Sequence, residues 1–150
     1  MSEENRKAIR ISVRNLVEFV LRSGDIDNRY SGNAQKDAML AGGRIHRKIQ
    51  KRMGSGYRAE VPLKHEVQDE EQEITLLVEG RADGIFTENG IPVIDEIKGM
   101  YTDISRLEEP IEVHLAQAMC YGYFYCCDKD LDGIRLQMTY CNLETEEIKR

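Results

Sequence analysis

Two strand-like segments joined by a tight turn constrain this chain more than any other feature. Residues 80–86 and 91–98 each carry apolar side chains in a pattern typical of strands, and Asn89-Gly90 lies between them. An Asn-Gly pair between two such segments is a strong signal for a two-residue β-hairpin. The sequence therefore predicts an antiparallel pair of strands within a sheet.

The hairpin has a consequence for three charged residues. Side chains alternate between the faces of a strand, so Glu96 and Lys98 share one face while Asp95 lies on the other. Pairing across the turn places Asp83 beside Glu96. We expect two carboxylates and one ammonium to converge, with Asp95 as a hydrogen-bonding neighbour on the opposite face.

Two carboxylates so close together need a cation between them. At a separation of about 5 Å and an effective dielectric constant near 20 they repel by about 3 kcal/mol, which Lys98 offsets only in part. Oxygen ligands from Asp and Glu suit magnesium and manganese. Such an ion polarises a phosphoryl oxygen and lowers the pKa of a bound water, so the pattern indicates metal-assisted phosphodiester hydrolysis.

These residues resemble a known family. Residues 80–83 (GRAD) and 96–98 (EIK) are similar to the G-x-x-D and E-x-K motifs of the PD-(D/E)XK nuclease superfamily, and residues 117–121 (QAMCY) resemble the Q-x-x-x-Y motif of its RecB-like branch. The resemblance covers about residues 40–142. It implies an α/β fold with a restriction-endonuclease-like core, in which a mixed central sheet is flanked by helices.

The resemblance also implies roles for individual residues. Asp83 and Glu96 would ligate magnesium or manganese, helped by the carbonyl of Ile97. Lys98 would orient the attacking water or stabilise charge on the phosphate. The substrate would be DNA, single-stranded or with a free end.

A helix expected over residues 33–53 has two faces. Ile45 and Ile49 fall on its apolar side, and the opposite sector carries five cations, which are Arg44, Arg47, Lys48, Lys51 and Arg52. This basic sector is either a solvated surface or a contact for the phosphate backbone. His46, at the edge of the apolar sector, is either a hydrogen-bonded core residue or a metal ligand. RecB-like nucleases often place a ligand histidine on a helix at this point.

A second helix is expected from Pro110 to about Cys127. Because it is apolar nearly all round, we expect it to be buried. A polar stripe at helical spacing consists of His114, Gln117, Tyr121 and Tyr125. Gln117 and Tyr121 either tie the helix to the catalytic strands or, as the resemblance implies, hold the active site and DNA phosphates. His114 is outside the motif and is expected to be a core histidine.

Other elements follow from local patterns. Ser12 is the expected N-cap of a helix over residues 13–21 with Gly24 as its stop, followed by a loop over residues 25–32. Residues 57–67 alternate except at Pro62, which predicts an edge strand. Residues 68–72 form an acidic turn, and residues 134–141 another strand.

The whole chain fits one domain over residues 1–150, and because it ends within an expected strand we expect it to be cut from a longer protein. The net charge of −6 divides into +6 over residues 1–60 and −12 over residues 61–150.

The sequence has no signal peptide and no apolar run long enough to span a membrane, so we expect a cytoplasmic protein with no membrane partner. Some RecB-like nucleases hold an iron-sulfur cluster with one cysteine upstream of the catalytic core. The four cysteines of this chain all lie at or after Cys120, so we expect no such cluster and expect buried thiols.

The opening residues 9–27 resemble the start of bacterial XPD/DinG-type helicases that carry an N-terminal nuclease. The favoured function is a metal-dependent deoxyribonuclease in DNA repair or recombination, fused to or associated with such a helicase. Two alternatives stay open. One is an inactive nuclease-fold module that binds DNA or docks a partner, and the other is a small acidic metal-binding regulator.

Overall fold

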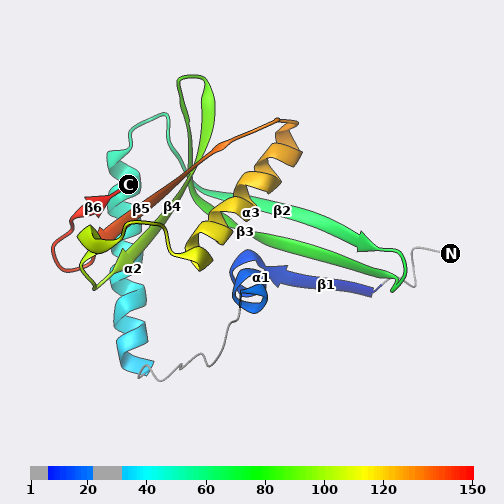
Figure 1. Ribbon diagram of the computed structural model, residues 1–150, viewed down its shortest axis with the longest axis horizontal. Helices are drawn as coiled ribbons and strands as arrows, with labels where there is room; N and C mark the ends of the chain where they lie inside the picture. Colours follow the sequence, from blue (N-terminus) through cyan, green and yellow to red (C-terminus); the bar gives the residue numbers. More distant parts are fainter. Residues whose placement is uncertain (1–6, 22–31) are drawn as a thin grey trace.

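The computed structural model describes residues 7–21 and 32–150, with residues 32–39 described in their backbone only. Along the described residues, one strand is followed by two helices, three strands, a short 3₁₀ helix, a third α-helix and two strands (Figure 1). The elements are β1 (Lys7–Ser12), α1 (Val13–Val20), α2 (Gly32–Arg52), β2 (Arg58–Asp69), β3 (Ile74–Glu88), β4 (Ile91–Met100), the 3₁₀ helix η2 (Ile104–Arg106), α3 (Glu112–Lys129), β5 (Arg135–Asn142) and β6 (Ile148–Lys149).

One mixed sheet joins the six strands of the described residues, in the order β1-β3-β4-β5-β6, with β2 added on β3. The β1–β3 and β4–β5 pairs are parallel, and the other pairs are antiparallel. The α/β fold with a mixed sheet flanked by helices is therefore confirmed. Strand β1 was not expected, because its pairing with residues 74–79 is non-local.

The predicted hairpin is confirmed as β3 and β4. Asn89 (φ 52°) and Gly90 (φ 79°) both adopt positive φ, as a type I′ turn requires. Gly84 pairs with Asp95, so the register places Asp83 and Glu96 next along the two strands. Among the described strands, β2 pairs only with β3, which confirms the edge position expected from Pro62.

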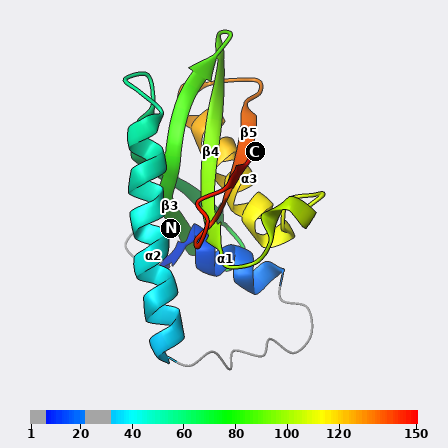
Figure 2. The same cartoon turned by 90° about the vertical axis from the view of Figure 1, so that its left-hand side faces the viewer.

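Helices α2 and α3 cover opposite faces of the sheet (Figure 2). Ile97 packs with Ile45 and Ile49 of α2 in one cluster. Ile94, three residues earlier on β4, packs instead with Tyr121 of α3 in the main core. The alternation expected for β4 is thus confirmed, and its two faces meet different helices.

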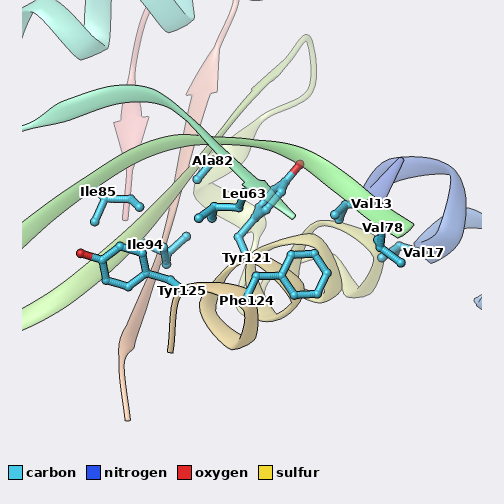
Figure 3. Close-up of a cluster of buried hydrophobic side chains, with 10 residues drawn as sticks. All are labelled: Val13, Val17, Leu63, Val78, Ala82, Ile85, Ile94, Tyr121, Phe124 and Tyr125. Carbon is cyan, nitrogen blue, oxygen red and sulfur yellow. The ribbon is translucent and has the colours of Figure 1, made fainter. Parts of the chain in front are cut away.

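The main core gathers under α3 (Figure 3). Its buried residues are Val13, Val17, Leu63, Val78, Ala82, Ile85, Ile94, Tyr121, Phe124 and Tyr125. They come from α1, α3 and three strands. Because these segments are far apart in the sequence, the core fixes α3 over the middle of β3 and β4.

Two expectations about helices need correction. Helix α3 begins at Glu112, after Pro110, and ends at Lys129. It is not buried all round, since Met119 and Tyr123 are 56% and 58% exposed on its outer side. Cys127 is exposed and Cys120 and Cys126 are only partly buried, so the expectation of buried thiols is wrong for the cysteines of this helix and holds for Cys141.

Helix α1 is capped as expected, because the Ser12 hydroxyl accepts a hydrogen bond from the amide of Asn15 at 3.1 Å. It ends at Val20. The expected stop at Gly24 and nearly all of the expected loop over residues 25–32 lie outside the described residues. Among the described helices, none combines the length and apolar character needed to span a membrane.

Candidate metal centre

The candidate site lies where strand β3 changes its neighbour. One edge of β3 pairs with β1 up to Glu79 and with β4 from Gly84 onward. Between these points the Asp83 side chain is bound to the main chain of β4, because its Oδ2 accepts a hydrogen bond from the amide of Ile97 at 2.7 Å. The carboxylate is thereby fixed in the gap between β3 and β4.

The pleat of the sheet is interrupted at the same point. Ala82 and Ile85 both belong to the core under α3, although residues three apart on an unbroken strand lie on opposite faces. Glu60, which the register places opposite Asp83, has a φ of 53°. Positive φ is uncommon for a residue other than glycine, so both strands depart from regular geometry beside Asp83.

Glu96 and Lys98 project together from β4, as expected. Lys98 Nζ lies 3.3 Å from Glu96 Oε1. The second oxygen of Glu96 is buried and has no hydrogen-bond partner among the described residues. Burial and, next, the charge of Asp83 raise the pKa of Glu96 to about 8, against the opposing effect of Lys98. Asp83 and Glu96 therefore act on each other electrostatically, as the hairpin predicted.

His46 reaches the site from α2. Its Nδ1 lies 3.4 Å from Asp83 Oδ1. Burial lowers the pKa of His46, but the hydrogen bond and the charge of Asp83 raise it by more, so the pKa is above its ordinary value. Gln50, one turn later, donates to the main-chain oxygen of Asp83 at 2.8 Å and to Glu60 at 3.0 Å. Helix α2 thus holds both Asp83 and Glu60.

The tightest group of possible metal ligands differs from the predicted one. One ligand atom from each of His46, Glu60 and Asp83 lies within 4.8 Å of the others. Glu96 is outside this group and approaches Asp83 from the α3 side of the sheet. The predicted set is therefore divided, with Asp83 between His46 and Glu96. The structure gives the Ile97 amide a role, while a role for its carbonyl stays a prediction.

Sequence reasoning missed Glu60. The expected turn gave no signal for it, because a hairpin folded about residue 70, the centre of residues 68–72, would place residue 60 opposite residue 80. In the structure the turn lies further along the chain, and residue 60 falls opposite residue 83, between the pairs Ala59–Gly84 and Val61–Ala82. The donor set is chemically suitable for a divalent cation, since carboxylate oxygens and an imidazole suit manganese, and carboxylates suit magnesium.

Tyr121 approaches the site from α3 because Gly80 has no side chain. A Cβ at Gly80 would lie 2.6 Å from the Tyr121 hydroxyl oxygen. Burial, and then the charges of Glu96 and Asp83, raise the pKa of Tyr121. Gln117 is buried one turn earlier on α3. Among the described residues it makes no hydrogen bond with Asp83, Glu96 or Lys98, so its part in the site stays a prediction.

Asp95 occupies a separate environment, as its position on the other face predicted. Its carboxylate accepts hydrogen bonds from the hydroxyls of Tyr57 at 2.7 Å and Thr139 at 2.6 Å, and from Gln137 at 3.3 Å. Tyr57 reaches it across Gly84, where any Cβ would overlap the tyrosine ring. Asp95 is therefore a structural acid.

The basic sector of α2 faces away from the sheet. All five of its cations are exposed: Arg44, Arg47, Lys48, Lys51 and Arg52. Lys48 is already paired, because its Nζ lies 2.7 Å from a carboxylate oxygen of Glu146. Contact of the sector with nucleic acid stays a prediction.

His114 contacts the Tyr140 hydroxyl through its Nδ1 at 3.0 Å, and burial lowers its pKa to about 4, as expected for a core histidine.

Comparison with known proteins supports the fold alone. No protein-family model matches this chain, and no curated protein matches it. Solved structures do match. A crystal structure of SSO0001 aligns with a TM-score of 0.62 and 19% sequence identity, over 93% of this chain and 64% of that chain. At this identity the likeness extends to the α/β architecture, and function has to be argued from the site itself.

Proposed function

We propose that this chain is a magnesium- or manganese-dependent deoxyribonuclease of the PD-(D/E)XK type, in its RecB-like branch. The observation that carries the proposal is the unpartnered buried oxygen of Glu96 beside Asp83 and Lys98. A buried carboxylate oxygen without a donor is costly, and a divalent cation is the partner that it lacks. Burial also raises the pKa of Glu96, because its charged form lacks sufficient compensation.

Each residue has a role in this proposal. Asp83 would hold the ion with Glu96 on one side and His46 on the other, and Glu60 adds a carboxylate that the motifs did not predict. Ligands at about 2.1 Å from magnesium lie no more than about 4.2 Å apart. The group of His46, Glu60 and Asp83, with its 4.8 Å limit, would need only a small contraction to meet that spacing.

The bound ion would polarise a phosphodiester and lower the pKa of a water. Lys98, held by Glu96, supplies a fixed positive charge next to the reacting phosphate. The Ile97 amide keeps Asp83 oriented whether or not an ion is present. Tyr121 closes the α3 side of the site and limits the access of bulk water. Coupling to a helicase stays a prediction, because no described contact bears on it.

The test is degradation of labelled single-stranded DNA with manganese, magnesium or EDTA. We expect degradation with manganese, none with EDTA, and a loss in Lys98→Ala. Lys129→Ala, at an exposed position remote from the site, is the matched control and should keep full activity. DNA binding without any metal-dependent degradation would favour the inactive binding module. Equal degradation by wild type and Lys98→Ala would overturn the assigned role of Lys98.

A further inference from the structure

A cavity outside the metal centre lies on the ribbon formed by β2 and β3. Its volume is about 550 Å³, and it is lined by Pro62, Leu63, Lys64, Glu79, Gly80 and Arg81. Figure 1 shows β2 and β3 running side by side past α3 to the end of the sheet where β1 lies. The cavity is thus a concave surface continuous with the strand that carries Asp83.

The two cations of this cavity lie on the same side of the sheet as His46, the part of the metal centre that α2 provides. Gly80 faces Tyr121 of α3, so its neighbour Arg81 points to the opposite side. Leu63 belongs to the core under α3, so Lys64 also points away from α3. Asp83 contacts His46 on α2, which is on that same side.

The spacing of these cations suits a linear polyanion. At about 3.4 Å per residue, Arg81 is about 7 Å along β3 from Asp83, and Glu79, opposite Lys64, is about 14 Å away. These are about one and two phosphate intervals of an extended single strand. Both cations are exposed, and neither forms an ion pair with any described residue. With Glu79, the described residues that line the cavity carry a net charge of +1.

We propose that this surface, Arg81 and Lys64 on the β2–β3 ribbon, binds the phosphate backbone of the single nucleic-acid strand that enters the metal centre. The proposal rests on the proposed function for the identity of the polymer. The described residues that line the cavity include no aromatic side chain, so we expect binding there to be through phosphates and independent of base sequence. Two cations in line along one ribbon follow a single backbone, and the described residues that line the cavity include no further cation.

The test measures binding of a fluorescent 20-nucleotide single strand over a range of salt concentrations, in EDTA so that no cleavage is needed. Each phosphate contact on a single strand contributes about 0.7 to the slope of log affinity against log salt. We expect Lys64→Gln/Arg81→Gln to lower the magnitude of that slope by about 1.4. Arg106→Gln/Lys129→Gln removes the same charge at two exposed positions elsewhere and should lower it by much less.

Three results would overturn this proposal: an unchanged slope in Lys64→Gln/Arg81→Gln, an equal change in the control pair, or an equal loss on a 20-base-pair duplex. Failure of the proposed function is detected separately, with bis(p-nitrophenyl) phosphate and manganese. That small diester needs the metal centre and no extended surface. If the double variant shows the expected slope change but wild-type protein does not hydrolyse the diester, the proposed surface is kept and the nuclease assignment is lost.

Discussion

Two adjacent residues of β4, Asp95 and Glu96, are both buried carboxylates, yet their surroundings differ in almost every respect. Asp95 is fully buried and accepts three hydrogen bonds. Glu96, at 4% exposure, has a lysine against one oxygen and no partner for the other among the described residues. The strand turns the two acids to opposite faces, one toward Tyr57 and Thr139 and the other toward the α3 side.

The difference separates a structural acid from a candidate functional one. A carboxylate whose acceptors are all used stabilises the fold and has nothing left with which to bind an ion. A buried carboxylate with an unused oxygen is destabilising by itself, and such groups concentrate at functional sites. The comparison predicts that changing Asp95 affects folding most, while changing the Glu96–Lys98 pair affects chemistry most.

The largest expected effect on stability comes from Asp95→Ala. It leaves the Tyr57 and Thr139 hydroxyls buried without an acceptor, and each such donor costs about 1–3 kcal/mol. We expect the free energy of unfolding in urea to fall by about 3 kcal/mol or more. Adding Tyr57→Phe to this variant should recover part of the loss. A fall of less than about 1 kcal/mol would mean that the Asp95 network contributes little.

Lys98→Ala should reverse that pattern. We expect the rate of manganese-dependent DNA hydrolysis to fall by about 100- to 1,000-fold, because fixed charges at a reacting centre are worth about 2.7–4 kcal/mol. The urea midpoint should move little, since Glu96 can take up a proton when its partner is removed. Lys129→Ala provides the control for both measurements. A variant that unfolds while wild type does not would place Lys98 with Asp95 among the structural residues.

Glu96→Gln tests whether burying the charged form of Glu96 destabilises the metal-free protein. With a folded pKa of about 8 and an ordinary value of 4.5, folded Glu96 keeps a proton that unfolded Glu96 releases. Between these values the free energy of unfolding therefore falls as pH rises, by at most about 1.4 kcal/mol per pH unit. We expect the variant to exceed wild type in stability by about 2 kcal/mol at pH 8 and to match it near pH 5.

The raised pKa of His46 acts in the same direction, since its stabilising contribution is lost as pH rises through the folded value. It remains in Glu96→Gln, so the variant keeps a weaker slope. Manganese should flatten the wild-type curve, because binding requires the deprotonated ligands. If the free energy of unfolding depends on pH in the same way for wild type and variant across pH 5–8, Glu96 does not destabilise the metal-free protein as its charge forms.

The smallest expected effect is that of Glu60→Gln, which tests whether the metal centre extends to β2. Glu60 is exposed, and an amide oxygen can still act as a ligand, so we expect manganese affinity by calorimetry to weaken about fivefold, or about 1 kcal/mol. Glu88→Gln, at an exposed position at the end of β3, is the matched control. Unchanged affinity in Glu60→Gln would confine the site to His46, Asp83 and Glu96.

Local patterns were enough to predict much of the hairpin and the faces on which its acids lie. The Asn89-Gly90 turn sets the register of β3 and β4, and alternation along β4 places Asp95 and Glu96 on opposite faces. The Ser12 cap and the edge strand marked by Pro62 were also recognisable. In each case the cause acts over a few residues, through turn geometry, a capping hydroxyl or a missing amide hydrogen.

Long-range features were harder to predict. The exposed outer side of α3 was missed because its apolar content does not show which side the sheet covers. Strand β1 pairs with residues more than sixty positions later, and no local pattern marks that pairing. The inclusion of Glu60 depends on β2 lying against β3 and on α2 reaching both strands through Gln50.

The amino-acid sequence alone establishes which acids can share a face of β4, because alternation along a strand is a property of the backbone. Whether each acid finds partners depends on segments brought together from elsewhere. Tyr57 and Thr139 supply donors to Asp95, whereas nothing among the described residues supplies one to the second oxygen of Glu96. Burial and hydrogen bonding are properties of the packed molecule, so only the tertiary structure distinguishes the two carboxylates.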